Sequence, residues 1–269
     1  MKVFLSADME GTCGVVSWPE TERSAPFDYS PIQKQMTREV AAACRGALTG
    51  GAGEVLVKDA HDSARNIDPT VLPRQIRMNR GWSGDLLSMM SGLDKEEFGA
   101  VIFTGYHAWA SSDGNALSHT MNGRNNTVTL NGTLCSEFLL NTYTAGYYGV
   151  PVVMVTGDAA LCAFAKELIP AITTVPVNVG VGGGVTSLHP DEAVERIEAA
   201  AAEAVKKTDQ CKVPMPEHFH MEIDFVKHHV AYSKHFYPGA YLKGTKCVCF
   251  DSDDWYEILR FCHFVLSNA

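Results

Sequence analysis

Short apolar segments alternate with longer amphipathic ones along the first two thirds of this chain, and this alternation most limits the folds that it can adopt. Apolar runs such as 2–7, 54–58 and 151–155 are typical of strands that are buried on both faces. Segments such as 33–48 and 136–147 have the spacing and boundary residues of helices. Buried strands that alternate with helices predict an α/β fold with a mostly parallel sheet between two helical layers, a three-layer α/β/α arrangement.

The pattern changes after about Val177, where a glycine-rich stretch, 180–184, precedes an Ala/Glu-rich helix. We therefore predict an α/β metal-binding catalytic domain at 1–177 and a smaller C-terminal α+β subdomain at 178–269. The other expected strands are 100–104, 127–130, 173–177, 218–226 and 246–250, and the other expected helices are 159–168, 189–207 and 255–266.

The acidic composition restricts the partners of the chain. Its 269 residues include 22 Lys and Arg against 31 Asp and Glu, a net charge of −9. This balance argues against binding to nucleic acid or to an anionic membrane surface. No segment reaches the roughly 18 apolar residues of a membrane span. Asp8 interrupts the N-terminal apolar run, and eight cysteines without a CxxC pair are typical of free thiols, so we expect a cytoplasmic protein.

Acidic and imidazole side chains follow several of the predicted strands, namely Asp8 and Glu10, Asp59 and His61, His107, and Asp158. In open α/β sheets, ligands bind beyond the carboxyl ends of the strands. Carboxylates and imidazoles together suit Zn²⁺ or a similar divalent ion. Each residue taken alone is equally typical of a helix cap, a turn or a hydrogen-bonded surface position. The residue pattern therefore leaves a metal site and a set of caps both open.

Three further side chains each allow two interpretations. His119 follows a polar loop, so it is either a surface residue or, beside a metal site, a proton carrier or oxyanion donor. Glu137 opens a predicted helix, where the helix dipole favours any carboxylate. Cys135 has no evident activating base, which favours a small buried thiol over a nucleophile.

Several short motifs occur in a fixed order before residue 170. They are Asp8-Met9-Glu10-Gly11, Asp59-Ala60-His61, Gly105-Tyr106-His107-Ala108, Ser118-His119-Thr120-Met121, Asn131-Gly132 through Glu137, 141–152 and Gly157-Asp158. This order resembles the signature of the D-aminopeptidase DppA family of zinc peptidases, peptidase family M55. Two departures stand out: Ser136 replaces an expected Gly, and 180–184 carries no charge where relatives tend to have a basic residue.

The resemblance implies a dinuclear site with two Zn²⁺ per subunit. Its implied ligands are Asp8 as the bridging carboxylate, with Glu10, His61, His107 and Glu137. It assigns His119 a catalytic role outside the ligand set, and Asp59 a supporting role, such as orienting His61. It also implies a ring-shaped homo-oligomer whose sites face an inner channel, with a decamer as one size.

The leading interpretation is a metallo-aminopeptidase that removes the N-terminal residue of short peptides, including peptides that contain D-amino acids. The alternatives are a dinuclear metallohydrolase of another small substrate, such as a phosphoester or a non-peptide amide, and a metal-dependent peptide-binding protein. Aromatic residues of the C-terminal third either form subunit contacts or fill the subunit's own core: Phe219, Phe225, Tyr232, Phe236, Tyr237 and Tyr241.

Overall fold

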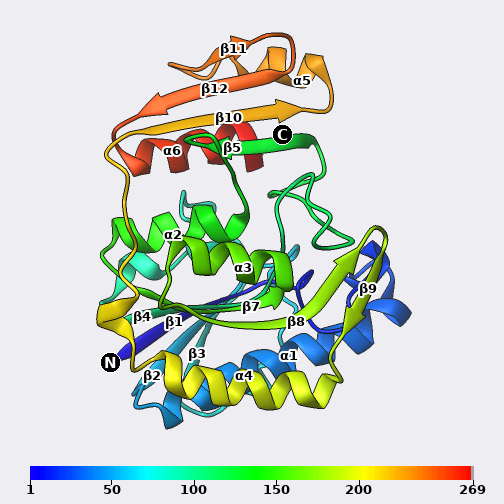
Figure 1. Ribbon diagram of the computed structural model, residues 1–269, viewed down its shortest axis with the longest axis vertical. Helices are drawn as coiled ribbons and strands as arrows, with labels where there is room; N and C mark the ends of the chain where they lie inside the picture. The colour runs from blue at the N-terminus through cyan, green and yellow to red at the C-terminus, as the bar shows by residue number, and fades with distance from the viewer. Residues whose placement is uncertain (268–269) are drawn as a thin grey trace.

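The computed structural model describes residues 1–267, which form two sheets (Figure 1). The larger sheet has the strand order β3-β2-β1-β4-β7-β8-β9, and all neighbours are parallel except β8 and β9. Its strands are β1 (Lys2–Ala7), β2 (Glu54–Asp59), β3 (Ile76–Asn79), β4 (Ala100–Tyr106), β7 (Val152–Asp158), β8 (Thr173–Val181) and β9 (Gly184–Ser187).

Helices cover both faces of this sheet (Figure 1). One face carries α1 (Pro26–Thr49) and α4 (Pro190–Ala204), and the other carries α2 (Glu137–Tyr147) and α3 (Ala159–Leu168). Helices α1 and α4 lie against each other because α1 presents glycine there. A Cβ on Gly46 would lie 2.2 Å from the carbonyl oxygen of Glu198 in α4.

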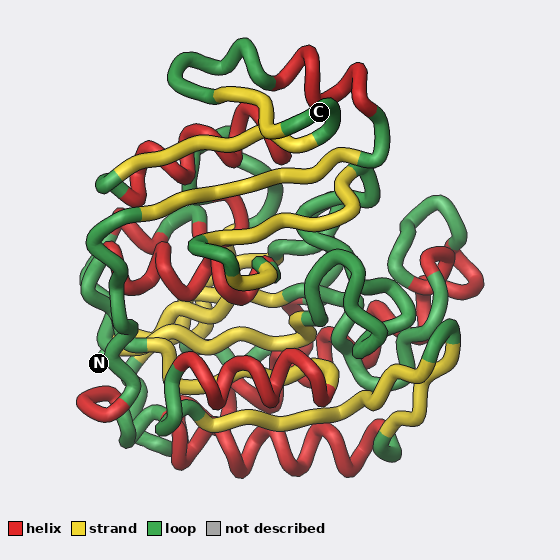
Figure 2. The backbone as a smooth tube through the Cα atoms, turned by 45° about the horizontal axis from the view of Figure 1, so that its top comes forward, coloured by secondary structure: helices red, strands yellow, loops and turns green. Residues whose placement is uncertain are grey.

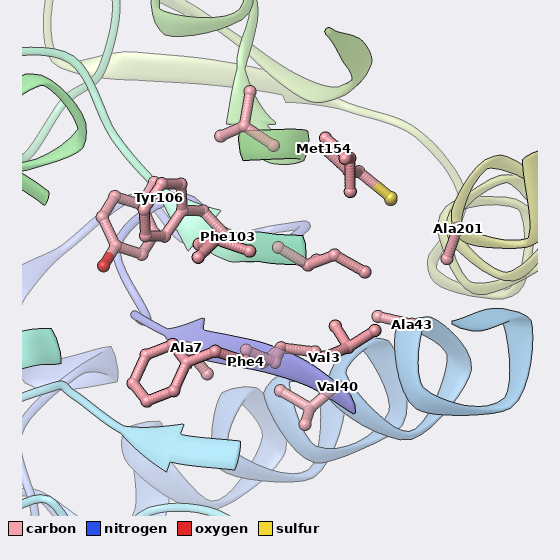
Figure 3. Packing of buried hydrophobic residues seen from close by; sticks show 14 of the residues in the cluster. Val3, Phe4, Ala7, Val40, Ala43, Phe103, Tyr106, Met154 and Ala201 are labelled. Carbon is pink, nitrogen blue, oxygen red and sulfur yellow. The ribbon is translucent and has the colours of Figure 1, made fainter. Parts of the chain in front are cut away.

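The central strands β1, β4 and β7 are almost wholly buried. Figure 3 shows the layering: Phe4 and Phe103 come from adjacent strands, Val40 and Ala43 come from α1, and Ala201 comes from α4. Burying a large apolar side chain contributes about 1.5–3 kcal/mol. This core fixes the positions of the strand ends, where the candidate site lies.

The second sheet is antiparallel and has the order β11-β12-β10-β5-β6. Its strands are β5 (Asn125–Leu130), β6 (Thr133–Leu134), β10 (Phe219–Phe225), β11 (Tyr241–Lys243) and β12 (Cys247–Ser252). Strand β10 alternates strictly between buried and half-buried residues, as expected for a sheet with one face on a core. The remaining helices are α5 (His228–Lys234) and α6 (Trp255–Phe261), which a π-helical turn, Cys262–Ser267, continues.

Helices separate the two sheets, as both views of the backbone show (Figures 1 and 2). Helix α2 belongs to both hydrophobic cores. Phe138 and Ala145 lie in the core of the larger sheet, whereas Leu139 and Leu140 lie in the core of the smaller sheet. Trp255 of α6 packs in the smaller core and is 1% exposed.

The predicted fold class, a mostly parallel sheet between helical layers with a smaller α+β part, is confirmed. Helix α1 begins earlier than predicted, at Pro26, and continues through Pro31, which lies inside the helix. The glycine-rich stretch 180–184 contains the end of β8, the turn at residues 182 and 183, and the first residue of β9. Helix α4 packs on the larger sheet, and the smaller sheet takes β5 and β6 from the middle of the chain. The domain boundary after residue 177 stays a prediction.

Candidate metal centre

The structure brings the five predicted ligands together at the carboxyl ends of β1, β2 and β4. Asp8 and Glu10 follow β1, His61 follows β2, His107 follows β4, and Glu137 is the first residue of α2. Each of these residues is at most 7% exposed. Five ionisable side chains from four separate segments therefore share one buried place.

Their donor atoms form two groups of three that share Asp8. One group is Asp8, Glu10 and His61, and the other is Asp8, His107 and Glu137. In the first group, His61 Nδ1 lies 3.3 Å from Asp8 Oδ1 and 3.0 Å from Glu10 Oε2. In the second, His107 Nε2 lies 3.5 Å from both Asp8 Oδ2 and Glu137 Oε2. Asp8 thus has one oxygen directed to each group.

Three polar atoms of this cluster are buried without a hydrogen-bond partner: Asp8 Oδ2, Glu10 Oε2 and His107 Nε2. Asp8 Oδ2 and His107 Nε2 face each other at 3.5 Å. An unpartnered buried polar atom costs about 1–3 kcal/mol. A separation of roughly 3.3 Å is expected between two ligands of one tetrahedral ion with bonds of about 2.0–2.1 Å. The geometry therefore fits a shared cation better than a direct hydrogen bond.

The electrostatics of the cluster point the same way. Burial raises the pKa of Asp8 well above its usual value, and the charges of Glu10 and Glu137 add to this rise. Burial would also raise the pKa of Glu137, but the charge and hydrogen bond of His107 and the charge of His119 together outweigh burial and lower the pKa to about 2. Burial would lower the pKa of His107, but Glu137 raises it well above its usual value. The carboxylates thus attract positive charge into a buried space.

His119 lies beside the cluster on the loop that follows β4. Its ring stacks on that of His107, with centroids 4.3 Å apart. Its Nδ1 faces the carbonyl oxygen of Leu117 at 2.8 Å, so Nε2 points to the cluster, 3.5 Å from Glu137 Oε1 and 3.8 Å from Glu10 Oε1. Since Glu10, His107 and His119 also form a compact donor group, geometry alone permits His119 as a ligand.

Close backbone packing joins the ends of β1 and β4. Gly105 has φ +68°, and a Cβ there would lie 2.2 Å from the carbonyl oxygen of Asp8. A Cβ on Gly11 would lie 1.9 Å from the carbonyl oxygen of Tyr106. Glycine at both positions lets the two strand ends approach, which places Asp8 next to His107.

Asp59 and Asp158 support the loops of the site. Asp59 accepts hydrogen bonds from the backbone N–H groups of Asn66 and Ile67 and from the Asn66 side chain. The His61 ring contacts the carbonyl oxygen of Thr21 at 2.9 Å. Asn66 Nδ2 donates to both Asp59 Oδ1 and the His61 carbonyl oxygen, so Asp59 supports the backbone of His61 through Asn66. Asp158 caps α3 and accepts from the Ala108 N–H, which fixes the backbone after His107.

A cavity of about 290 Å³ opens onto the cluster. Trp18 and Trp82 line its wall, and Glu22 and Asp62 add carboxylates. Sequence reasoning missed both tryptophans, because they lie in loops without periodicity. The edge-on contact of Trp18 with His119, 5.2 Å between centroids, exists only in the folded chain.

Cys135 is fully buried in the core of the smaller sheet. Burial raises the pKa of its thiol well above the usual value, which opposes the reactive thiolate. The interpretation of Cys135 as a small buried thiol fits this position.

Comparison with known proteins settles the family. Residues 1–264 match the model of peptidase family M55, described as D-aminopeptidase. The chain belongs to this M55 D-aminopeptidase family. It is 34% identical to a D-aminopeptidase of Bacillus subtilis (strain 168) over 262 residues, 96% of this chain and 93% of the relative.

A solved relative of the M55 family has the same fold. It is described as the Zn-dependent D-aminopeptidase DppA from Bacillus subtilis, a self-compartmentalizing protease. The TM-score is 0.89 at 31% sequence identity, covering 97% of this chain and 95% of the other. The family resemblance and the prediction of a metallo-aminopeptidase are thereby confirmed. The match also includes the C-terminal third, where the sequence motifs were weak.

Proposed function

We propose that this M55 peptidase holds two Zn²⁺ ions per chain. The proposed ligands are Asp8 as the bridging carboxylate, with Glu10 and His61 on one side and His107 and Glu137 on the other. The observation that carries this proposal is the buried, unpartnered pair Asp8 Oδ2 and His107 Nε2 within two donor groups that share Asp8.

The donor chemistry supports zinc. Imidazole nitrogens and carboxylate oxygens suit borderline divalent ions. Three ionised carboxylates beside neutral imidazoles carry three negative charges, which two divalent ions would balance with one positive charge left over. Such a pair of ions supplies Lewis-acid activation of a carbonyl and lowers the pKa of water.

The cavity favours the N-terminal end of a short peptide as substrate. The cavity, of about 290 Å³, opens directly beside the cluster, so the end of a peptide bound there would lie against the proposed ions. Glu22 and Asp62 give its lining negative charge that attracts a protonated α-amine, and Trp18 and Trp82 offer apolar walls. None of the described residues that line it is Lys or Arg, which disfavours a phosphoester. We therefore propose aminopeptidase action on short peptides, including those with D-amino acids.

His119 is the proposed proton carrier of this reaction. Its Nε2 faces the carboxylates of Glu10 and Glu137, and the residue lines the cavity. A histidine there can give a proton to the leaving amine or donate a hydrogen bond to the developing oxyanion. The stacking on His107 and the contact with Trp18 keep its ring in place.

We propose that the chain assembles into a homo-oligomeric ring whose sites face an inner channel, with a decamer as one size. The description of its solved relative as self-compartmentalizing supports this proposal. Within the aromatic set of the C-terminal third, Phe219 and Phe225 fill the subunit's own core. Tyr232 and Phe236 are 61% and 67% exposed, so they remain candidates for subunit contacts.

The cysteines support a reducing compartment, and we propose the cytoplasm. All eight are free, and seven are buried. Disulfides are rare in cytosolic proteins. No helix among residues 1–267 combines the length and apolar character that crossing a bilayer needs.

Hydrolysis of matched dipeptides tests the proposed function. Purified chain is assayed on D- and L-aminoacyl dipeptides, with chelator, with chelator then Zn²⁺, and without treatment. We expect hydrolysis that chelator abolishes and Zn²⁺ restores. The matched control is the same dipeptide with an acetylated amine, which should not be cleaved. Equal cleavage of the acetylated peptide, phosphate release from a phosphoester instead, or peptide binding without turnover would contradict the proposal.

A further inference from the structure

A second group of metal-binding side chains lies on the outer face of the five-stranded sheet, far in sequence from the interior ligands. Strands β10 and β12 pair so that Glu222 lies opposite Cys249 and His220 opposite Asp251. Their alternate neighbours, Met221 and Val248, point into the small core. The pairing therefore gathers imidazole, carboxylate and thiol groups on one face.

The donor atoms of this outer cluster lie close enough together to surround a single ion after small side-chain movements. Donor atoms of His220, Glu222 and Cys249 all lie within 4.8 Å of one another. Cys247 Sγ lies 3.8 Å from Cys249 Sγ and 4.0 Å from Glu222 Oε2. Two thiolates at the usual Zn–S distance of about 2.3 Å stand roughly 3.8 Å apart in tetrahedral geometry. The two sulfur atoms already have this separation.

The histidine of this cluster is already oriented for a metal. His220 Nδ1 lies 2.7 Å from Asp251 Oδ1, which leaves Nε2 directed at Glu222 Oε1, 2.9 Å away. A carboxylate behind a histidine is the recurrent support of a metal-binding imidazole. Lys243 pairs with Glu222, but its side chain is 65% exposed and is free to turn into solvent when a cation takes its place.

We propose that the outer face of the small sheet binds one thiophilic divalent cation, Zn²⁺ or a chemically similar ion, through His220, Glu222, Cys247 and Cys249. Four protein ligands close the coordination sphere, which is the pattern of a structural rather than a catalytic zinc site. The ion would cross-link β10 to β12. Binding releases the thiol protons, because thiolates are the ligands. This ion is additional to the two proposed for the interior cluster, which contains no thiol.

Cobalt substitution distinguishes the two sites, because only the outer one offers sulfur. Co²⁺ is added to metal-free chain whose thiols are reduced, and the near-ultraviolet absorption is recorded. We expect an intense thiolate-to-Co²⁺ charge-transfer band whose final intensity corresponds to one thiolate-bound Co²⁺ per chain. The double variant Cys247→Ser/Cys249→Ser should lose this band and bind one metal fewer per chain. The readout is independent of peptide hydrolysis, so it tests the outer site even if the proposed function fails.

Two further variants complete the test. His220→Ala should weaken Co²⁺ binding at the outer site at least tenfold, whereas His229→Ala, at an exposed histidine of α5 outside the cluster, should leave it unchanged. His107→Ala should keep the band. Absence of the band in the reduced parental chain, or its persistence in the double cysteine variant, would overturn the proposal.

Discussion

His107 and His119 stack on each other, yet the structure gives them different surroundings. His107 is 1% exposed and its Nε2 has no hydrogen-bond partner, whereas His119 lines the cavity. We expect His107→Ala to lower the metal content of the purified chain. His119→Ala should keep the metal and lower kcat by about 10²–10⁴-fold, the usual contribution of a general acid or base.

Elemental analysis and dipeptide kinetics check this pair of variants. The interior cluster should hold two ions per chain, and the comparison is best made in the Cys247→Ser/Cys249→Ser background, where the outer site is removed. His218→Ala serves as the control for loss of a histidine. Equal metal loss in His107→Ala and His119→Ala would show that His119 is a ligand.

Glu39 predicts a pH dependence that is separate from the metal site. Burial raises its pKa to about 7 from a usual 4.5, although Gln35 and the Cys13 N–H donate to it. Between these values the folded chain holds a proton that the unfolded chain has released. Stability therefore falls as the pH rises through this window. Glu39→Gln has no carboxyl group to ionise at this position. Its free energy of unfolding, relative to that of the parental chain, should therefore rise by up to about 3 kcal/mol between pH 4.5 and pH 7.

Urea unfolding of the parent and Glu39→Gln at pH 4.5 and pH 8 measures this effect, at one fixed metal concentration. A difference between the two chains that does not change with pH would contradict the raised pKa.

The residues that form the interior cluster differ in how far the sequence predicts them. Asp8, Glu10, His61 and His107 follow apolar strands, so their meeting at one sheet edge follows from general α/β topology. Glu137 opens a helix, where a carboxylate is common for other reasons, and only the family resemblance singled it out. Trp18 and Trp82 come from loops whose paths depend on tertiary packing, so no local pattern marks them.

Among the elements, the close approach of the β1 and β4 ends gives a prediction for Gly105. Gly105→Ala places a Cβ 2.2 Å from the Asp8 carbonyl oxygen, at φ +68°. We expect a loss of more than about 1 kcal/mol in stability, with weaker metal binding because Asp8 must move. Gly149→Ala is the control: its φ is +71°, and nothing lies within 4 Å of the added Cβ.

Chemical unfolding and zinc titration of both variants provide the measurement. The Gly149 variant should lose stability through backbone strain alone and keep its metal affinity. Unchanged metal affinity in Gly105→Ala would show that the close approach does not set the position of Asp8.

The central strands were predictable because they are buried on both faces, and burial leaves a continuous apolar run in the sequence. Edge strands leave no such run. β3 and β9 are short and partly exposed, and β11 has only three residues, so none was predicted. Helix α5 was missed for the same reason, since it buries only Ala231.

At the scale of the whole molecule, assembly should control which substrates reach the site. We expect a homo-oligomer in sedimentation at micromolar concentration, with cleavage of short peptides and no digestion of a folded protein. Phe236→Glu should shift the population toward smaller species, because charge opposes burial of that 67% exposed side chain in a contact. Phe27→Glu, at 93% exposure on α1, is the matched control.

A lone 29.3 kDa species in the parental chain would refute assembly. Efficient digestion of a folded protein would independently contradict restricted access to the site.

The contacts of helix α2 with both cores limit how the small sheet can be replaced in a redesigned protein. Its first residue, Glu137, reaches the interior cluster, and the next turn divides its side chains between two cores. A domain that replaces the small sheet must therefore provide the same packing contacts for Leu139 and Leu140. Otherwise α2 would change its position and move Glu137, a proposed ligand, away from Asp8 and His107. The same requirement limits how freely the small sheet can diverge in evolution while the chain keeps its chemistry.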